Sequence, residues 1–463
     1  MKFINREIEL EVLEEACRSG KAELVIIYGR RRIGKTTLLS VFAKHRNAIY
    51  LIVNFDEREP ALRDLTSQFL DQVKLPYTPL IQSFSDLYLL FNQVNASIII
   101  IDEFQRLHNT GGVTELQHIW DRHLSKGHKI IILCGSSVGM MERIGLSYES
   151  PLYGRATRVL KIKELDYGAA RSFVEKYGEE DKVRTYAVFG GTPGYLALID
   201  DEKSLLQNIK NLILDPGATL REEPLTLLSM ELREPTRYIQ VLEAIAQGAT
   251  KLGEIASKTG FKTSDIAKYI RILEKELDLI ERKYPILEEG KRGKARYYLK
   301  NNFFKFWFSY IFPHINLLEF GLQDRVLDII ERNIDIYTSK VFEDIALQHF
   351  ISLSHEGAFE FTKIGKWWQK DIEIDIVAID EKKLNTYFIE VKWTKKPVDK
   401  RELYKLISKA QEFPWMRDRR RETYVMYSKA GYTFEKEENI YTFTLKDIQT
   451  HFSKNKPKIK VIN

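Results

Sequence analysis

The sequence is poor in cysteine and has no long hydrophobic run. Cys17 and Cys134 are the only cysteines among 463 residues, and neither has ligand-like neighbours. A disulfide framework and a thiolate zinc site are therefore excluded, and a reducing compartment fits best. No apolar run approaches the roughly 18 residues that span a bilayer, and the first residues are too charged for a signal peptide. We expect a cytoplasmic protein with no membrane partner.

Excess charge of either sign is also scarce. The chain has 71 Lys and Arg against 65 Asp and Glu, a net charge of +6 that alone is poor evidence for nucleic-acid binding. The excess is concentrated in residues 392–421, which hold 11 Lys or Arg against four Asp or Glu. Aromatic residues lie among these cations, at Trp393, Tyr404, Phe413 and Trp415. Such a segment is a candidate DNA contact through phosphates, and a solvated basic helix face is the alternative.

Short apolar stretches alternate with helical patterns over the first two hundred residues. This alternation is typical of an α/β fold with a largely parallel sheet covered on both faces. The expected strands are Glu23 to Tyr28, Ala48 to Asn54, Ser97 to Ile101 and Lys129 to Cys134.

A glycine-rich loop follows the first of these strands and precedes a helical pattern from Thr37 to Lys44. It fits the pattern G-x-x-x-x-G-K-[ST], in which glycines let backbone N–H groups turn toward phosphate at a helix N-terminus. We expect Lys35 to reach the β- and γ-phosphates of a nucleotide and the Thr36 hydroxyl to bind Mg²⁺. The loop residues are Gly29, Arg30, Arg31, Arg32, Ile33, Gly34, Lys35, Thr36 and Thr37.

Two carboxylates follow the strand that begins at Ser97, which we expect on a neighbouring position of the sheet. Asp102 is predicted to hold the Mg²⁺ shell and Glu103 to polarise the attacking water. Ser136, after the next strand, is a candidate sensor of the γ-phosphate, with a plain strand-to-turn exit as the alternative. Arg155 is a candidate for stabilising transition-state charge, either in cis or from a neighbouring subunit, so a homo-oligomer is left open.

Together these motifs resemble the archaeal ATPase family, relatives of the AAA+ and STAND NTPases. The resemblance covers about residues 1–230 and includes Pro151-Leu-Tyr-Gly-Arg155 and Gly190-Gly-Thr-Pro-Gly194. It implies a core that binds ATP, with a small helical lid. It also implies that the segment holding Phe3 and Arg6 lies near adenine and that the lid turn holding Pro193 approaches the nucleotide.

The middle of the chain has the outline of a winged helix-turn-helix, over residues 231–300. Helical patterns over Tyr238 to Gln247, Leu252 to Lys258 and Thr263 to Glu276 precede a hairpin from Tyr284 to Leu299. DNA contact and a protein-docking role are both open for this unit. The residues expected to face DNA are Lys262, Ser264, Lys268 and Arg271 on the last helix, and Lys291, Arg292, Lys294 and Arg296 on the hairpin.

The C-terminal unit, residues 336–463, follows an aromatic segment within 301–335 that we expect to be core or an interdomain face. Two alternating stretches predict an antiparallel hairpin in which Asp375 lies opposite Glu390, near enough to share a metal, with Lys392 on the same face. This arrangement resembles the PD-(D/E)xK nuclease superfamily, which implies Glu343 as a further metal ligand and a restriction-endonuclease-like fold. Ile374 stands where the superfamily's proline is expected.

The leading hypothesis is an Mg²⁺-dependent ATPase whose nucleotide state controls DNA engagement, with metal-dependent DNA cleavage by the C-terminal unit through Asp375, Glu390 and Lys392. The alternative is a slow ATP-driven switch or regulatory platform in which the nuclease fold is inactive.

Overall fold

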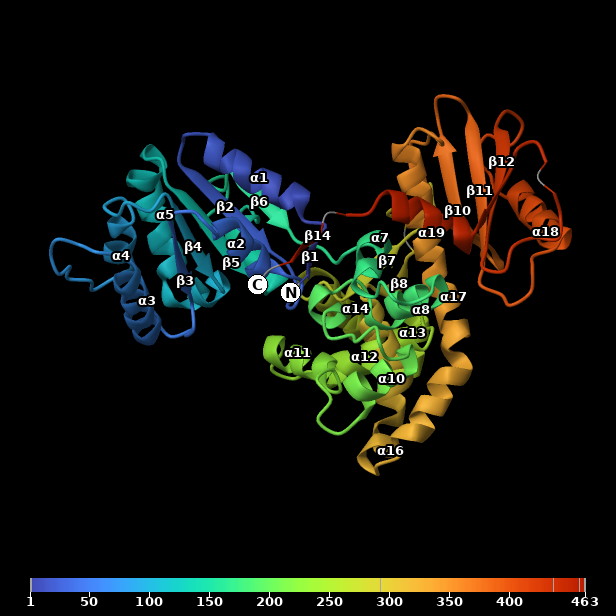
Figure 1. Cartoon of the computed structure of the whole chain (residues 1–463), viewed down its shortest axis with the longest axis horizontal. Helices are drawn as coiled ribbons and strands as arrows, with labels where there is room; N and C mark the ends of the chain where they lie inside the picture. Colours follow the sequence, from blue (N-terminus) through green and yellow to red (C-terminus); the bar gives the residue numbers. More distant parts are fainter. Residues whose placement is uncertain (1, 292, 436, 458, 462–463) are drawn as a thin grey trace.

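The computed structural model describes residues 2–291, 293–435, 437–457 and 459–461, so Arg292 of the expected hairpin lies outside the described residues. Figure 1 shows an α/β body formed by the first part of the chain, a helical body in the middle and a second α/β body at the C-terminal end. The long helix α17 (Gln323–His355) runs from the helical body into the C-terminal one.

The first body has a five-stranded, fully parallel sheet with the order β3-β4-β5-β2-β6. Alternate residues of β2 enter different hydrophobic clusters, Leu24 and Ile26 on one face and Val25 and Ile27 on the other, because helices cover both faces. The strands are β2 (Glu23–Tyr28), β3 (Ala48–Ile52), β4 (Ile98–Asp102), β5 (Ile130–Gly135) and β6 (Arg158–Lys161). The helices are α1 (Glu7–Arg18), α2 (Lys35–Ala43), α3 (Arg58–Gln72), α4 (Phe84–Leu90), η1 (Phe104–Thr110), α5 (Gly112–Arg122), η2 (Leu124–Lys126) and α6 (Val138–Gly145).

Two features of this sheet differ from the sequence prediction. The strand that ends at Asp102 is not next to the phosphate-loop strand, because β5 lies between β4 and β2. Strand β6 was not predicted, and it completes the sheet on the other side of β2.

The two ends of the chain pair with each other. β1 (Lys2–Ile4) is antiparallel to β14 (Ile459–Val461), and the two strands lie side by side in Figure 1. This pairing ties the C-terminal end to the segment just before the first helix.

The helical body begins with the lid and continues into the predicted winged-helix region, whose helices start and end within a few residues of the expected positions. β7 and β8 form an antiparallel hairpin after the third helix of that region. The lid helices are α7 (Tyr167–Ala170), η3 (Arg171–Phe173), α8 (Glu179–Phe189), α9 (Pro193–Leu196), α10 (Leu205–Ile209), η4 (Lys210–Leu214) and α11 (Glu223–Glu231). The following elements are α12 (Thr236–Ala246), α13 (Leu252–Thr259), α14 (Thr263–Arg271), η5 (Ile272–Glu276), β7 (Ile280–Lys283) and β8 (Arg296–Leu299).

The C-terminal body is a mixed sheet with the order β13-β12-β11-β10-β9, antiparallel across β9, β10 and β11 and parallel across β11, β12 and β13. Its elements are β9 (Lys363–Gln369), β10 (Ile372–Asp380), β11 (Asn385–Lys392), α18 (Lys400–Gln411), β12 (Arg421–Ser428), β13 (Ile440–Thr444) and α19 (Leu445–Lys454). The aromatic segment before it forms α15 (Asn302–Phe306), η6 (Trp307–Ile311), η7 (Phe312–His314) and α16 (Ile315–Glu319).

The expected limit between residues 335 and 336 is wrong, because it falls inside the continuous helix α17. One hydrophobic cluster runs from the lid through the aromatic segment to one face of the C-terminal sheet, so a linker has no place there. Phe303, Phe304, Phe306, Trp307 and Phe308 are fully buried in this cluster, which confirms the expectation that the aromatic stripe is core.

Candidate functional site

The phosphate loop joins β2 to α2 and is held by its own lysine. Gly34 has a φ of +94°, a left-handed conformation that favours glycine, and it begins α2. The Lys35 Nζ donates hydrogen bonds to the carbonyl oxygens of Gly29, at 2.8 Å, and Arg30, at 3.0 Å. Burial lowers the pKa of this amine. The cationic side chain therefore lies beneath the loop, at the N-terminus of a helix that favours anions.

Asp102 reaches the loop although its strand is separated from β2 by β5. The Thr36 hydroxyl donates to Asp102 Oδ2 at 3.1 Å, and the Tyr50 hydroxyl donates to the same oxygen at 2.7 Å. The backbone N–H of Glu103 donates to Asp102 Oδ1 at 2.9 Å. A hydroxyl and a buried carboxylate thus lie side by side at the start of α2. Tyr50 had no sequence signal, because it lies within a strand whose tyrosine looked like core.

Glu103 and Ser136 lie together at the carboxyl edge of the sheet. The Ser136 hydroxyl donates to Glu103 Oε2 at 2.8 Å, and Gln105 Nε2 donates to the same oxygen at 2.5 Å. Glu103 has a φ of +54°, unusual for a residue with a side chain. Position and strain both point to a functional carboxylate, while its role stays a prediction. Gln105 was missed because a lone glutamine carries no motif.

The lid turn packs on the phosphate loop. The Gly194 N–H donates to the Arg32 carbonyl at 3.0 Å, and a Cβ added at Gly34 would lie 3.9 Å from Pro193 Cγ. Arg6 donates to the Ile33 carbonyl at 3.1 Å, so it braces the loop backbone.

Two further arginines of the loop contact the lid and the aromatic segment. Arg32 forms an ion pair with Glu223 at 2.6 Å, and the Arg30 guanidinium lies 4.7 Å from the centre of the Phe304 ring. Phe3 is buried in the cluster that holds Ile33. The adenine contacts implied for Phe3 and Arg6 stay predictions.

Arg155 lies at the wrong edge of the sheet to act on the nucleotide of its own chain. It forms a two-pronged ion pair with Asp121, at 2.8 and 2.7 Å. It precedes β6, whose first residue pairs with Val25 near the start of β2, whereas the phosphate loop follows the end of β2. A six-residue strand spans about 20 Å. The cis role is therefore wrong, and only a role from a neighbouring subunit stays a prediction.

The hairpin predicted in the C-terminal body is present with the expected register. Ile376 pairs with Ile389 across β10 and β11, which sets Asp375 opposite Glu390. The Val391 N–H donates to Asp375 Oδ2 at 2.9 Å. Asp375 also lies at an irregularity in the pairing of β10 with β9, between Ile374 and Val377. Such irregularities re-aim side chains at functional sites.

The carboxylates of this region are held by lysines. Glu390 forms ion pairs with Lys392 at 2.7 Å and Lys409 at 2.9 Å. Glu343 pairs with Lys366 at 2.9 Å. Within the described part of the chain, no group of three or more His, Cys, Asp and Glu side chains is placed to hold a metal. Glu343 and Glu390 are each engaged by lysines, and their sharing of a metal ion with Asp375 stays a prediction.

Asp375 gives the clearest expected pH dependence. Burial and the nearby carboxylates Glu343 and Glu390 raise the pKa of its carboxyl group to about 7. The folded chain then binds a proton that the unfolded chain has already released, so the free energy of unfolding should fall as pH rises from about 4 to about 7. Asp375→Asn should remove this pH dependence. The free energy of unfolding of the variant minus that of the unchanged chain should therefore rise by about 2 kcal/mol between pH 5 and pH 8. Urea unfolding of both proteins across this range measures it. If the free energies of unfolding of the two proteins differ by the same amount at every pH, the raised pKa of Asp375 is contradicted.

The helices and hairpin predicted to face DNA are only partly free. Lys262, Ser264, Lys268 and Arg271 are exposed on α14 or at its start.

The hairpin instead docks on the C-terminal sheet. The Ile286 N–H donates to the Lys366 carbonyl at 2.8 Å. Arg296 pairs with Glu373 at 2.8 Å and lies 4.5 Å from the Trp368 ring centre. The prediction that Arg296 faces DNA is therefore wrong. Lys291 and Lys294 pair with Glu288 at 3.4 and 3.1 Å.

More than half of the cations in the basic segment 392–421 form ion pairs with carboxylates of the protein. Arg420 is fully buried and pairs with Glu422 at 2.8 Å, and Lys405 pairs with Glu402 at 2.6 Å. Trp393 and Phe413 are core residues and do not face solvent, whereas Tyr404 is exposed. The cations of the segment that are exposed and have no ion pair among the described residues are Lys395, Lys396, Arg417, Arg419 and Arg421.

Comparison with known proteins identifies the first body. ATPase domains found predominantly in Archaea match residues 3–199. An uncharacterized protein of Methanocaldococcus jannaschii is 37% identical over 395 residues, 84% of this chain and 87% of that protein. The chain belongs to this archaeal ATPase family. An uncharacterized ATP-binding protein of the same organism is 50% identical over 44 residues, 10% of this chain and 75% of that protein.

The fold of this archaeal ATPase is also found among solved structures. A Walker-type ATPase of Pyrococcus abyssi has a TM-score of 0.51 at 21% identity, covering 66% of this chain and 96% of that one. Residues 307–406 match a family of archaeal and bacterial proteins of unknown function. The prediction of an α/β phosphate-loop ATPase is confirmed. In the part of the chain that the structure describes, every helix is too short or too polar to cross a membrane.

Proposed function

We propose that this archaeal ATPase is an Mg²⁺-dependent switch whose nucleotide state controls DNA engagement. One contact carries the proposal. α6 follows Ser136 and packs closely on η5, the continuation of α14, where a Cβ added at Gly139 would lie 2.6 Å from Glu276 Cα. Arg143 of α6 also pairs with Glu276 at 3.2 Å. A shift of the segment beside the γ-phosphate therefore has a rigid route to the helix proposed to meet DNA.

In the proposed mechanism, water attacks the γ-phosphate in line. Lys35 binds the β- and γ-phosphate oxygens, which replace its loop carbonyl partners, and Glu103 orients the water. Mg²⁺ fits the adjacent oxygen donors of Thr36 and Asp102, a set this cation prefers. When bound, the ion neutralises charge on the phosphates. Ser136 contacts Glu103 directly, so a hydrogen bond from its hydroxyl to the γ-phosphate would report whether that phosphate is present.

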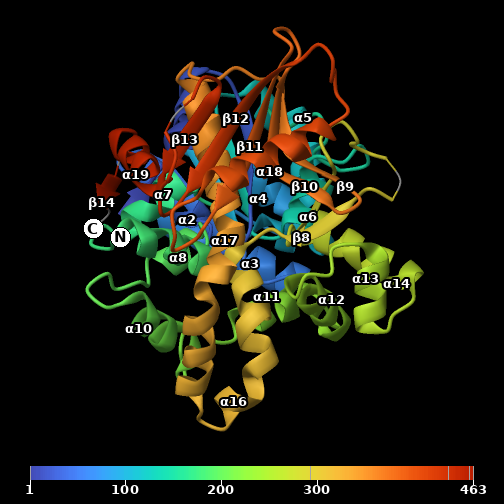
Figure 2. The ribbon, with the colours of Figure 1, turned by 90° about the vertical axis from the view of Figure 1, so that its right-hand side faces the viewer.

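The DNA-binding surface of the proposed winged helix is the outer face of α14. Ser264, Lys268, Arg271 and Lys275 follow one another at helical spacing along this face, and all are exposed. Lys268, Arg271 and Lys275 have no ion-pair or hydrogen-bonding partner among the described side chains. α14 lies at the periphery of the molecule in Figure 2. An unpaired basic stripe on an outer helix supports phosphate contact in a groove.

The stripe gives a testable DNA phenotype. Lys268→Ala combined with Arg271→Ala should weaken duplex binding about tenfold and reduce the slope of log affinity against log salt by about 2, because two phosphate contacts are lost. Fluorescence anisotropy at several salt concentrations measures both. Arg63→Ala on α3 is the control, since Arg63 is an exposed cation with no side-chain partner in the described chain. Equal affinity and slope in the double variant and the control would contradict the proposal.

Metal-dependent DNA cleavage by the C-terminal body is the second candidate. The register that sets Asp375 opposite Glu390, with Lys392 on the same strand, favours it. Cleavage with Mg²⁺ or Mn²⁺ should disappear in Asp375→Ala and Lys392→Ala and remain in Lys35→Ala. No cleavage of duplex, single-stranded or branched DNA would instead favour a binding switch with an inactive nuclease fold.

A further inference from the structure

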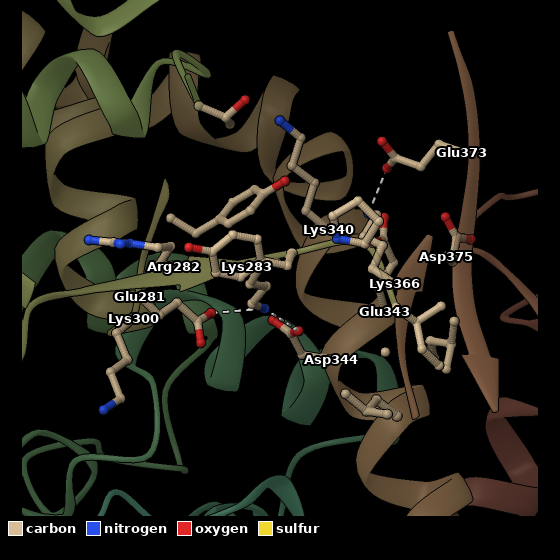
Figure 3. A pocket seen from close by; sticks show the side chains of 18 of the residues that line it. Glu281, Arg282, Lys283, Lys300, Lys340, Glu343, Asp344, Lys366, Glu373 and Asp375 are labelled. Carbon is tan, nitrogen blue, oxygen red and sulfur yellow. Dashed lines mark hydrogen bonds and ion pairs between the residues drawn. The ribbon is translucent and has the colours of Figure 1, made fainter. Parts of the chain in front are cut away.

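A cleft of about 1090 Å³ lies between the β7–β8 hairpin, α17 and the edge formed by β9 and β10. Figure 3 shows its side chains, with Lys340, Glu343 and Asp344 coming from α17 and Lys366, Glu373 and Asp375 from the sheet. The docked hairpin fixes one wall. Ile286 joins the core cluster of Trp367 and Ile374 in the C-terminal body. The cleft is therefore a built feature of the folded chain, and Asp375 lies at its end.

Six lysines and Arg282 line the cleft beside six carboxylates. Lys300 and Lys363 pair with carboxylates outside the cleft, Asp278 and Glu381, both at 2.8 Å. Lys366 pairs with Glu343 and Glu373 at 2.9 and 2.6 Å. Lys283 pairs with Glu281 at 2.8 Å and lies 3.9 Å from Asp344. Both of these lysines are thus neutralised by carboxylates within the cleft.

Lys305 and Lys340 have no such partner. Neither forms an ion pair or hydrogen bond through its ammonium within the described residues. The recorded contact of Lys305 is with the Tyr337 ring, whose centre lies 5.9 Å from Nζ. Lys305 is largely buried, and a cation in such a place is costly unless an anion joins it. Two cations of one cleft thus have no carboxylate in direct contact, although Asp344 and Glu343 lie near Lys305, and such cations can take an anionic ligand.

We propose that this cleft binds phosphate groups of a short single-stranded nucleic acid segment, with Lys305 and Lys340 as the phosphate-contacting residues. The volume of about 1090 Å³ is slightly above the range of about 300–1000 Å³ for small-ligand sites, which suits a few nucleotides. Tyr284 and Tyr298 also line the cleft, and aromatic rings are the side chains on which bases of single strands stack; the Lys283 ammonium lies 5.5 Å from the centre of the Tyr298 ring. The inference rests on the proposed engagement of DNA and adds a second contact beyond α14, beside Asp375.

The test is fluorescence anisotropy of the full chain with a labelled oligonucleotide of about six nucleotides. Lys340→Ala and Lys305→Met should each weaken binding about three- to tenfold and reduce the salt slope by about 0.7, the value for one phosphate of a single strand. Arg325→Ala is the matched control, because Arg325 is an exposed cation on the same helix outside the cleft. Lys340 is exposed, so its replacement tests the site even where Lys305→Met reduces stability.

Competition identifies the source of the phosphate. In a Lys35→Ala background, displacement of the labelled oligonucleotide by unlabelled oligonucleotide, but not by AMP or inorganic phosphate, supports a single-stranded nucleic acid as the ligand. Displacement by AMP at the same concentration would overturn the proposal of a single-stranded ligand and indicate a free nucleotide instead. Unchanged affinity in Lys340→Ala and Lys305→Met would overturn the cleft site, and the α14 double variant then tells whether DNA engagement itself stands.

Discussion

Lys35→Ala is expected to abolish ATP binding at concentrations that saturate the unchanged chain, a loss of about a hundredfold or more in affinity. Lys35 supplies the buried positive charge beneath the loop, and its two hydrogen bonds to the Gly29 and Arg30 carbonyls show that its ammonium already lies at the loop's centre. Without it, the phosphates lose a charge-assisted hydrogen-bond partner at the loop. Titration with a fluorescent ATP analogue measures the loss.

The control is Lys44→Ala, which removes an exposed lysine immediately after the same helix. Thermal unfolding of both variants separates a binding defect from a folding defect. Tight ATP binding by a folded Lys35→Ala protein would remove this loop from the nucleotide site.

Glu103→Gln is expected to bind ATP normally and to lose turnover by about a hundredfold to a thousandfold, within the usual contribution of a positioned general base. Glutamine keeps the shape and accepts the hydrogen bond from Ser136, which is 2.8 Å long in the structure, but it cannot hold the attacking water as a carboxylate does. Phosphate release at saturating ATP measures the rate constant, and titration measures the affinity.

A matched variant sharpens this result. Gln105→Ala removes the second side chain that donates to Glu103 but keeps the carboxylate, so its turnover should fall much less. If Glu103→Gln hydrolyses ATP as fast as the unchanged chain, the water-orienting residue lies elsewhere.

The sequence predicted local features well. The first strand, Glu23 to Tyr28, matches β2 at both ends because a buried parallel strand is a continuous apolar run bounded by turns. The opposition of Asp375 and Glu390 followed from counting residues about a turn, since hairpin register depends on nearby residues alone.

The missed features depend on distant segments. Pairing of β1 with β14 joins the two ends of the chain, and the insertion of β5 between β2 and β4 is a choice of strand order that no local pattern encodes. Arg155 looked catalytic in a motif, yet its position depends on where β6 joins the sheet. The docking of Arg296 on Glu373 likewise requires two bodies to meet.

The distribution of charge along the sequence likewise does not show which cations are paired in the fold. The excess in residues 392–421 is real, but Glu390, Glu402 and Glu422 neutralise several of its cations in the fold. Five cations of the segment stay exposed and unpaired, and further unpaired cations lie on α14 and in the cleft, on elements whose net charge is unremarkable. Placement of charge relative to partners, rather than its density along the chain, indicates where phosphate can bind.

The central claim is that the nucleotide state controls DNA binding, and the most direct measurement uses Glu103→Gln, which should hold ATP without hydrolysing it. Its affinity for duplex DNA should be measured by anisotropy with Mg²⁺ and ATP, with Mg²⁺ and ADP, and without nucleotide. At least about a tenfold difference is expected between the ATP and ADP states, equal to about 1.4 kcal/mol of coupling. Lys35→Ala should show no difference. Equal DNA affinity of Glu103→Gln in all three conditions would show that the nucleotide does not control DNA binding.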